Sequence, residues 1–327
     1  MAIGVISIGA HLPERVVSNR EIAAWANTTE QWVAERTGIL ERRYAADDEA
    51  TSDLALPAAR AALQAAGPEA KDRLAALIVA TCTPDHPQPS TAAVVQAGLG
   101  LPALPAFDVN AVCSGFLYAL TIAKALLDGQ PGQNALVVGA DVFSRIMDRG
   151  DRKTVSLFGD GAGAVVLGPV PEGYGIHGST LLANGELHDY VKVAAGGSRT
   201  PLDERARGAG EHLFRMDGRA VRDYAMTTLH KVVGQTLAEC GARLEDVDRF
   251  VFHQANTRLL ESFAVEAGIG RDKVALTAPS LGNTAGASVP LTLHHTNRTR
   301  PLERGERVLL ASIGGGMTAG ATLLTWY

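Results

Sequence analysis

Residues 105–126 read PAFDVNAVCSGFLYALTIAKAL, and this stretch indicates the fold on which the whole chain is built. Pro105–Asn110 has the short apolar pattern of a buried strand, and Cys113–Asp128 has the longer period of a helix. Cys113 therefore stands where a strand passes into the first turn of a helix. The unpaired N–H groups and the positive potential of a helix N-terminus favour a thiolate over a thiol. The sequence thus predicts a nucleophilic cysteine at this position.

Short apolar runs and longer helical periods alternate on both sides of this stretch, which is the pattern of a layered α/β architecture. The predicted strands are Gly4–Ala10, Leu74–Cys82, Pro105–Asn110, Ala135–Ala140, Gly163–Gly168, Phe250–His253 and Lys273–Thr277. The predicted helices are Leu54–Ala66, Thr91–Leu99, Cys113–Asp128, Arg219–Cys240 and Arg258–Ala267. The last 20 residues carry no charge, but glycines interrupt them, so we expect two buried strands around a glycine turn there rather than a membrane span.

A faint internal repeat runs through this alternation. Ala135–Asp141 followed by Gly161–Gly168 resembles Val308–Gly315 followed by Gly320–Trp326. Asp72–Thr81 similarly resembles Asp248–Gln254, since each is a charged turn entering an apolar run. The repeat predicts two similar halves, residues 1–172 and 173–327, which meet where two prolines and a glycine cluster.

The composition restricts the class of protein. The chain has 327 residues, 46% of them apolar and 20% charged, which is enough for a sizeable core. The net charge of −5 argues against a broad surface for nucleic acid or for an anionic membrane. Three scattered cysteines are too few for a disulfide framework or a zinc site. With no basic n-region at the start of the chain, we expect a cytoplasmic protein.

Two further residues are candidate partners for the nucleophile. His253 ends the apolar run Phe250–Phe252, and the carboxyl edge of a strand is where α/β proteins gather their sites. Asn283 lies in the small-residue loop LGNTAGASVP just before a helix. The turn at Gly314–Gly316 could offer backbone N–H groups to an oxyanion. The GDGAG stretch at 159–163 lacks the features of a phosphate loop or a dinucleotide fingerprint, so nucleotide binding is not expected.

Taken in order, these segments resemble the thiolase superfamily, and most closely β-ketoacyl-acyl-carrier-protein synthase III. The resemblance covers essentially the whole chain and rests on several long motifs in register. The matching segments are WVAERTGILERR at 32–43, AFDVNAVCSGF at 106–116, FGDGAGAVVLG at 158–168, HQANTR at 253–258, GNTAGASVP at 282–290 and GGG at 314–316.

The resemblance implies a duplicated thiolase fold of five layers, α-β-α-β-α, and a homodimer. It implies that Cys113 takes an acyl group from acyl-CoA and that the acyl-enzyme then condenses with malonyl-acyl-carrier protein, which loses carbon dioxide. His253 and Asn283 would stabilise the enolate, and the backbone N–H groups of Cys113 and Gly315 would hold the oxyanion. No metal or redox cofactor is implied.

The resemblance also implies a channel for coenzyme A and for the phosphopantetheine arm of the carrier protein. Its expected residues are Thr28, Trp32, Arg36, Arg152, Gly218, Ala255 and Asn256. Arg258 would help to dock the acidic carrier protein. Because the chain is acidic overall, we expect a local basic patch near Arg36 and Arg258.

The acyl pocket implied by the resemblance comprises Gln88, Phe143, Phe158 and Ile313. Gln88 replaces a frequent apolar residue that closes the partner's pocket in the dimer. Arg222 stands where the bacterial fatty-acid enzymes usually carry a phenylalanine. These departures predict an acyl primer other than the usual short one, in fatty-acid synthesis or in a specialised pathway such as polyketide priming.

Three alternatives remain at this point. An acyltransferase of the same family would use Cys113 to move an acyl group to a carrier protein or a small acceptor without releasing carbon dioxide. A catalytically silent partner subunit would typically lack the nucleophile, so Cys113, His253 and Asn283 argue against it. A thiolase would carry a second catalytic cysteine near the C-terminal glycine turn, and Gly314–Met317 contains none. The intact Asn283 favours decarboxylative condensation.

Overall fold

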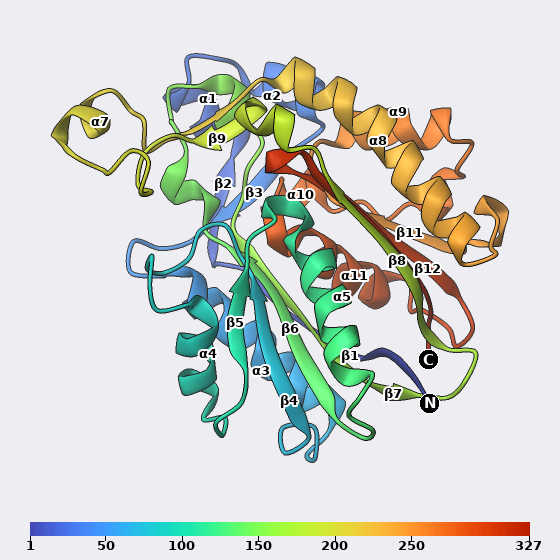
Figure 1. The fold of residues 1–327 in the computed structure, drawn as a ribbon. Helices are drawn as coiled ribbons and strands as arrows, with labels where there is room; N and C mark the ends of the chain where they lie inside the picture. The colour runs from blue at the N-terminus through green and yellow to red at the C-terminus, as the bar shows by residue number, and fades with distance from the viewer.

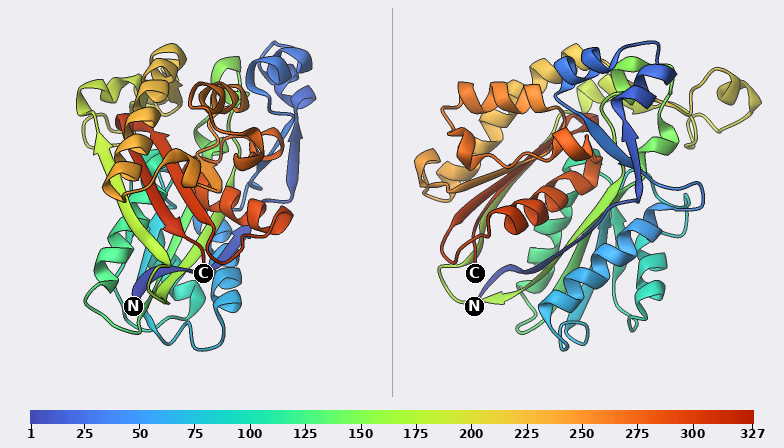
Figure 2. Two further views of the ribbon diagram at one scale, coloured as in Figure 1. Left: turned by 90° about the vertical axis from the view of Figure 1, so that its right-hand side faces the viewer. Right: turned by 180° about the vertical axis from the view of Figure 1, so that it is seen from behind.

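Two β-sheets with helices between and outside them make up the body of the protein (Figures 1 and 2). The computed structural model describes residues 1–327. The strands of the two sheets are β1 (Ala2–His11), β4 (Leu74–Ala80), β5 (Ala106–Val109), β6 (Asn134–Asp141), β7 (Gly161–Val170), β8 (Gly175–Ala183), β11 (Arg249–Phe252), β12 (Arg307–Gly314) and β13 (Thr318–Thr325). The strands of two smaller sheets are β2 (Arg15–Ser18), β3 (Glu41–Tyr44), β9 (Val191–Val193) and β10 (Phe214–Met216).

The first large sheet has the order β1-β7-β6-β4-β5, and the second has the order β11-β12-β13-β8. In the first sheet β4 pairs parallel with both β5 and β6, while β7 pairs antiparallel with β6 and β1. In the second sheet β11 and β12 are parallel, and β13 pairs antiparallel with β12 and β8. The first sheet ends at Val170 and the second begins at Gly175.

The sheet positions account for the repeat seen in the sequence. β6 and β7 form an antiparallel pair in the first sheet, and β12 and β13 form the corresponding pair in the second. β4 and β11, which the repeat also relates, are the parallel neighbours of β6 and β12. The prediction of two buried strands around a C-terminal glycine turn is confirmed by β12, β13 and the short turn between them.

The predicted strand Lys273–Thr277 is wrong. Only Val274 pairs there, through an isolated parallel bridge to Phe250, at the place where the first sheet has its fifth strand. The side chain of Gln254 binds three further backbone groups here: its oxygen accepts from the N–H groups of Thr277 and Ala278, and its nitrogen donates to the carbonyl of Ala275. Since these groups already have partners, no strand ladder forms.

Helices form the remaining three layers. They are α1 (Asn19–Trp25), α2 (Glu30–Thr37), α3 (Thr51–Ala66), α4 (Thr91–Leu99), α5 (Gly115–Leu127), α6 (Arg152–Val155), α7 (Glu204–Gly208), α8 (Gly218–Glu239), α9 (Thr257–Glu266), α10 (Ala278–Leu281) and α11 (Ser288–Thr299). One hydrophobic core contains α5, α11 and residues of both sheets, so these two helices form the central layer. Helices α3 and α4 pack on the outer face of the first sheet, and α8 and α9 on that of the second. The expected five-layered thiolase arrangement is confirmed.

A cap of smaller elements lies over one end of the layers. It contains the β2–β3 hairpin with α1 and α2, the β9–β10 hairpin, and a loop with α7 that projects away from the body (Figure 1). Residues of this cap join Cys113, Ala285 and apolar residues between Phe143 and Phe158 in a fourth apolar cluster. No helix combines the length and the apolar character that crossing a bilayer would need.

Candidate active site

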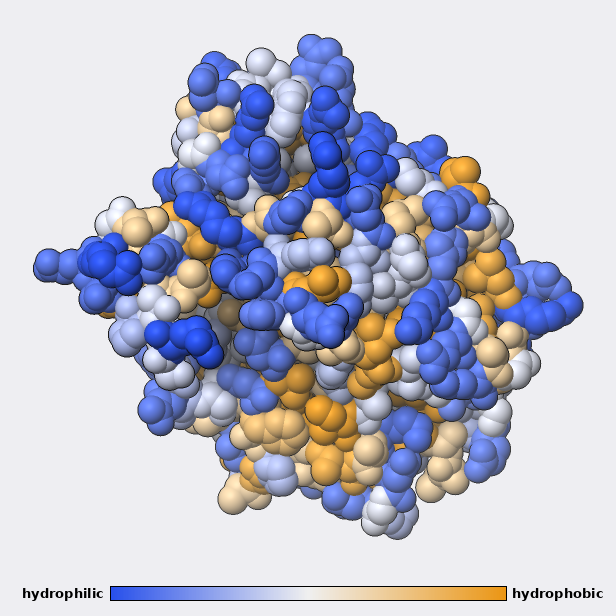
Figure 3. Space-filling view, turned by 45° about the horizontal axis from the view of Figure 1, so that its top comes forward, coloured by the Kyte–Doolittle hydropathy of each residue, from blue (hydrophilic) through white to orange (hydrophobic).

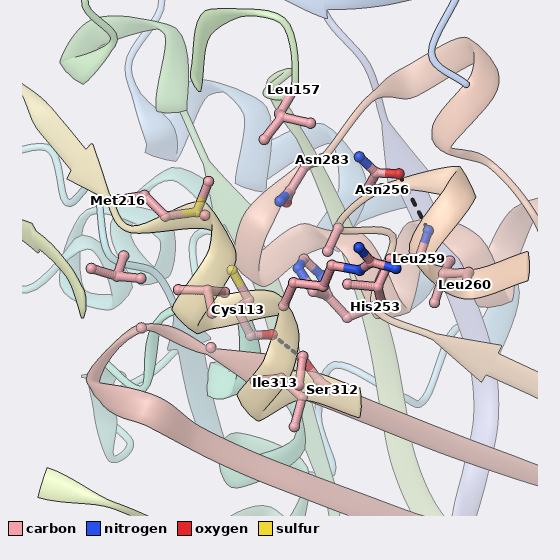
Figure 4. Close-up of a pocket in the computed structure, with 18 of the residues that line it drawn as sticks. Cys113, Leu157, Met216, His253, Asn256, Leu259, Leu260, Asn283, Ser312 and Ile313 are labelled. Carbon is pink, nitrogen blue, oxygen red and sulfur yellow. Dashed lines mark hydrogen bonds between the residues drawn. The ribbon is translucent and has the colours of Figure 1, made fainter. Parts of the chain in front are cut away.

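A cavity of about 410 Å³ opens where the cap meets the two halves. Its lining includes Cys113, His253 and Asn283, which the sequence predicts as the reacting set, together with Gly315. Figure 4 shows these three side chains facing the same space. Cys113 follows β5 and His253 follows β11, so both lie just beyond the carboxyl ends of parallel strands. The structure thus brings together residues that are 140 and 170 positions apart.

Strands of the second half hold the Cys113 turn in place. The Ser312 hydroxyl donates to the carbonyl of Cys113 at 2.8 Å, and the Thr318 hydroxyl donates to the carbonyl of Ala111 at 2.9 Å. The Ser114 hydroxyl returns a hydrogen bond to the carbonyl of Thr318 at 3.3 Å. Because these bonds are largely buried, the nucleophile's backbone is fixed by β12 and β13 rather than by its own half alone.

The backbone at this turn is strained and closely packed. Val112 has φ +48°, a conformation that is a genuine outlier for a β-branched residue. A Cβ on Gly314 would lie 2.9 Å from the nitrogen of Cys113 and 2.8 Å from the carbonyl oxygen of Ala111. Such strain is sustained only where the surroundings determine the conformation, as they do at functional sites. The close approach of Gly314 requires a residue without a side chain.

Burial opposes the effect that the helix N-terminus is expected to have on Cys113. Burial raises the pKa of the Cys113 thiol, and the nearby carboxylate of Asp141 raises it further. Asp141 is fully buried, and its oxygens accept hydrogen bonds from Thr81, Cys82, Thr83 and the N–H of Gly286. Desolvation is the largest cause of the raised pKa, and Cys113 lies in a short 3-10 turn beneath the cap.

His253 is a neutral imidazole in this site. It is buried, with 6% of its surface exposed, and burial lowers its pKa to about 3. Its backbone N–H donates to the carbonyl of Ala311, which ties it to β12. The Nδ1 atom has no hydrogen-bond partner in the protein. A neutral ring can donate one N–H to a substrate oxygen at neutral pH without first gaining a proton.

Asn283 presents its amide nitrogen to the cavity. Its side-chain oxygen accepts from the N–H of Ala285 at 2.9 Å, so the NH₂ group is the part left for a ligand. A parallel bridge between Asn283 and Phe158 fixes its backbone against the first half. The arrangement offers two neutral donors, from His253 and Asn283, on the side of the cavity opposite to the Cys113 turn (Figure 4).

The expected coenzyme A channel is partly assembled in the cavity. Arg36, Gly218, Ala255 and Asn256 line it. Thr28, Trp32 and Arg152 lie outside the lining, and the guanidinium of Arg152 stacks over the Trp32 ring at 5.1 Å. The roles of all seven in binding coenzyme A stay predictions.

Aromatic side chains form the wall of the expected acyl pocket. The rings of Phe143 and Phe158 stack at a centroid distance of 4.1 Å, and Phe214 meets both of them edge to face. These residues and Ile313 line the cavity. Gln88 lies exposed in the loop between β4 and α4 and does not line the cavity of its own chain, so its predicted role in a partner's pocket stays a prediction.

The basic patch expected near Arg36 and Arg258 stays a prediction: both arginines line the cavity, and Glu35 lines it beside them. Arg258 is paired with Glu261 at 3.0 Å and also donates to the carbonyl of Glu35. Helix α9 carries one arginine and two glutamates, and α2 likewise carries one arginine and two glutamates, so each has a net charge of −1. The two helices meet at the mouth of the cavity, where Asn256 donates to the carbonyl of Arg36 and Arg258 donates to the carbonyl of Glu35.

Several site residues escape prediction from the sequence. Ser312 and Thr318 flank the glycine turn and anchor the nucleophile, and Asp141 ends β6 beneath it. Phe214 and Met216 of β10 also line the cavity. They lie more than 50 residues along the chain from Phe158, the last site residue predicted in the first half. The hydroxyl residues Ser312 and Thr318 beside the GGG motif are the one sequence signal that could have indicated how the Cys113 turn is held.

The raised pKa of Cys113 predicts a specific pH dependence of its alkylation. Because the thiol loses its proton only at high pH, the rate of iodoacetamide reaction with Cys113 should still be rising with pH above about 9. The rate is measured by peptide mass spectrometry in a Cys82→Ala variant, which removes the second buried thiol. A plateau reached near pH 7 would show that the cysteine is already a thiolate at rest.

Two family models match the chain. 3-Oxoacyl-[acyl-carrier-protein] synthase III matches residues 107–185, and its C-terminal model matches residues 237–326. The first range contains Cys113, and the second contains His253, Asn283 and the glycine turn.

The chain is also similar over its whole length to characterised proteins. It is 47% identical to acetoacetyl CoA synthase NphT7 of a Streptomyces species, and 45% identical to β-ketoacyl-[acyl-carrier-protein] synthase III of Laribacter hongkongensis. Each alignment covers 98% of this chain and 98% of the relative. The crystal structure of β-ketoacyl-[acyl-carrier-protein] synthase III from Thermus thermophilus superposes with a TM-score of 0.91 at 38% identity, covering 99% of both chains.

Proposed function

Because the chain belongs to the 3-oxoacyl-[acyl-carrier-protein] synthase III family, we propose that it starts fatty-acid or polyketide chains by decarboxylative condensation of an acyl-Cys113 intermediate with a malonyl thioester. The observation that carries this proposal is the meeting of Cys113, His253 and Asn283 in one cavity. A cysteine supplies the nucleophile, and two neutral N–H donors can stabilise the negative charge of an enolate.

The first half-reaction is the acylation of Cys113 by an acyl-CoA. The sulfur attacks the thioester carbonyl, and the oxyanion forms against the backbone N–H groups of Cys113 and Gly315. The carbon–sulfur bond to coenzyme A then breaks, and the departing thiolate takes the proton that Cys113 gives up.

The second half-reaction joins the acyl group to a two-carbon unit. The malonyl carboxylate leaves as carbon dioxide, and its electron pair forms an enolate whose oxygen accepts from His253 and Asn283. The enolate carbon attacks the acyl-Cys113 carbonyl, the carbon–sulfur bond breaks, and Cys113 regains a proton. The product is a 3-oxoacyl thioester. Donors in a site sealed from water stabilise such a charge most strongly.

The alternative is an acyltransferase that moves the acyl group without condensation. Malonyl thioester labelled at its carboxyl carbon separates the two. Condensation predicts one labelled carbon dioxide for each 3-oxoacyl product formed. Product formation without release of label would contradict the proposal and favour acyl transfer.

The carrier of the malonyl unit is the point on which the relatives' names differ. The Laribacter relative is named for the acyl carrier protein, whereas the more similar Streptomyces relative is named for acetoacetyl CoA. Acyl-CoA as primer and either carrier as extender donor are compatible with the cavity, and no cofactor is required by either half-reaction. The three free cysteines are compatible with the proposed cytoplasmic location.

We also propose that the chain forms a homodimer through β5. This strand ends the first sheet, pairs only with β4 and leaves its other edge unpaired. Phe107 and Val109 are half-buried there. Figure 3 shows hydrophobic residues gathered on the lower part of the visible face. Helices α4 and α5 and strand β5 are at the front of this side in Figure 1. An exposed strand edge with apolar neighbours is a template for pairing with a second copy. Size-exclusion chromatography with light scattering tests this.

A further inference from the structure

The mouth of the cavity has an unusual distribution of charge. Three arginines line it: Arg36 from α2, Arg222 from the first turns of α8, and Arg258 from α9. Arg258 is neutralised by Glu261, but neither Arg36 nor Arg222 has a salt bridge or a side-chain hydrogen bond. Both unpaired side chains are exposed. The mouth therefore holds two free guanidinium groups directly at the cavity, between helices α2 and α9 whose own charges sum to −1 each.

These charges discriminate between a small anion and an acidic protein. Guanidinium groups bind phosphate through paired N–H donors, and two of them suit a compact ligand that carries several phosphates. An acidic carrier protein that rested on α2 and α9 would meet helices whose charges sum to −1 each. Like charges facing each other across an interface slow association and weaken binding. Coenzyme A and the carrier protein present the same pantetheine arm to the cavity. The residues at the mouth therefore determine which of the two carriers binds better.

We propose that Arg222, together with Arg36, binds the phosphate groups of coenzyme A and makes malonyl-CoA, rather than a malonyl-carrier protein, the preferred extender. This inference rests on the condensation proposed above and names the donor of its second substrate. Arg222 is a specificity-determining residue of this reaction: it contacts the phosphates that coenzyme A carries beyond the single phosphate of the phosphopantetheine arm. It leaves the reacting carbons to Cys113, His253 and Asn283.

The position of Arg222 in α8 supports this role. Val221, Ala225 and Leu229 of the same helix also line the cavity, so this face of α8 follows its wall. Arg219 lies one turn earlier, is equally exposed and does not line the cavity. Arg219 is therefore a matched control for Arg222, because it has the same charge and is also exposed but does not line the cavity.

The test starts from enzyme acylated on Cys113 with acetyl-CoA and freed of coenzyme A, so that only the second half-reaction is observed. Carboxyl-labelled malonyl-CoA, malonyl-pantetheine and a malonylated bacterial acyl carrier protein are then compared. We expect wild-type protein to use malonyl-CoA with a kcat/KM at least about tenfold above that for the malonyl-carrier protein. Arg222→Ala should raise the KM for malonyl-CoA about tenfold and change kcat less than about twofold.

The same variant should leave malonyl-pantetheine, which has no phosphate, within about twofold of wild type. Arg222→Lys should recover part of the loss, and Arg219→Ala should show none. Equal losses with malonyl-CoA and malonyl-pantetheine would overturn the phosphate contact, and faster use of the malonyl-carrier protein by wild type would overturn the donor preference. Failure of all three donors to release label would overturn the proposed condensation itself and this inference with it.

Discussion

Replacing Cys113 by alanine is expected to abolish acyl transfer to the protein. Incubation with an acyl-CoA should leave the mass of the intact variant unchanged, and formation of 3-oxoacyl product should fall by a factor on the order of 10⁴ or more. The reason is that no other side chain in the cavity is a nucleophile of comparable strength: Cys82 lies beneath the floor against Asp141, and Cys240 ends α8. Ser312, which does line the cavity, donates its hydroxyl proton to the Cys113 carbonyl.

The matched control for this variant is Cys82→Ala. It removes a thiol of the same size from the same apolar cluster but outside the cavity lining. We expect it to keep the acyl adduct. In Cys113→Ala the donors His253 and Asn283 remain, so slow release of carbon dioxide from malonyl thioester without any condensed product would show that the rest of the site is intact. An acyl adduct on Cys113→Ala would contradict the assignment of the nucleophile.

Replacing Asn283 by alanine should separate the two half-reactions. Removing one preorganised donor to a developing oxyanion typically lowers the rate by about 10²–10³, so we expect condensation to fall by that factor. Acylation of Cys113 should stay within about tenfold of wild type, because its oxyanion rests on backbone N–H groups elsewhere. Stopped-flow or quenched single-turnover measurements of the two steps give both rates on one preparation.

Asn283→Asp distinguishes the donor from the loop that carries it. Aspartate keeps the size of the side chain and can still accept from the N–H of Ala285, but it has no N–H to give. We therefore expect it to condense as slowly as the alanine variant while acylation persists. His253→Ala should likewise lose condensation more than acylation. Equal loss of both half-reactions in the Asn283 variants would show that the residue shapes the site rather than stabilising the enolate.

Most elements of the fold could be predicted from the sequence because their signals are local. The apolar period of Thr91–Leu99 and the run at Ala135–Ala140 gave helix and strand close to their observed bounds. Lys273–Thr277 has the same apolar character and is not a strand, because Gln254, some twenty residues away, occupies its hydrogen-bonding groups. A contact of that kind has no signature in the segment it alters.

The reacting residues could be identified by motif, but their electrostatic state could not. The position of Cys113 before a helix indicated a thiolate, while the structure buries it under the cap and beside Asp141. The pairing of Arg258 with Glu261 likewise has no signal in the sequence that would distinguish this arginine from the unpaired Arg36. Protonation and surface charge depend on which groups fold together, and spacing along the chain does not contain that information.

The hydrogen bonds from Ser312 and Thr318 to the Cys113 turn have a consequence for how the duplicated chain has diverged. Two copies of one unit share a fold, yet one supplies the nucleophile while the other supplies both the donors and the clamp that positions it. Neither copy keeps a complete set, so they have become complementary and can no longer be exchanged. Enzyme activity therefore depends sensitively on how the two halves pack together. A shift of β12 by a fraction of an ångström would misplace the Cys113 sulfur before any loss of secondary structure could be detected.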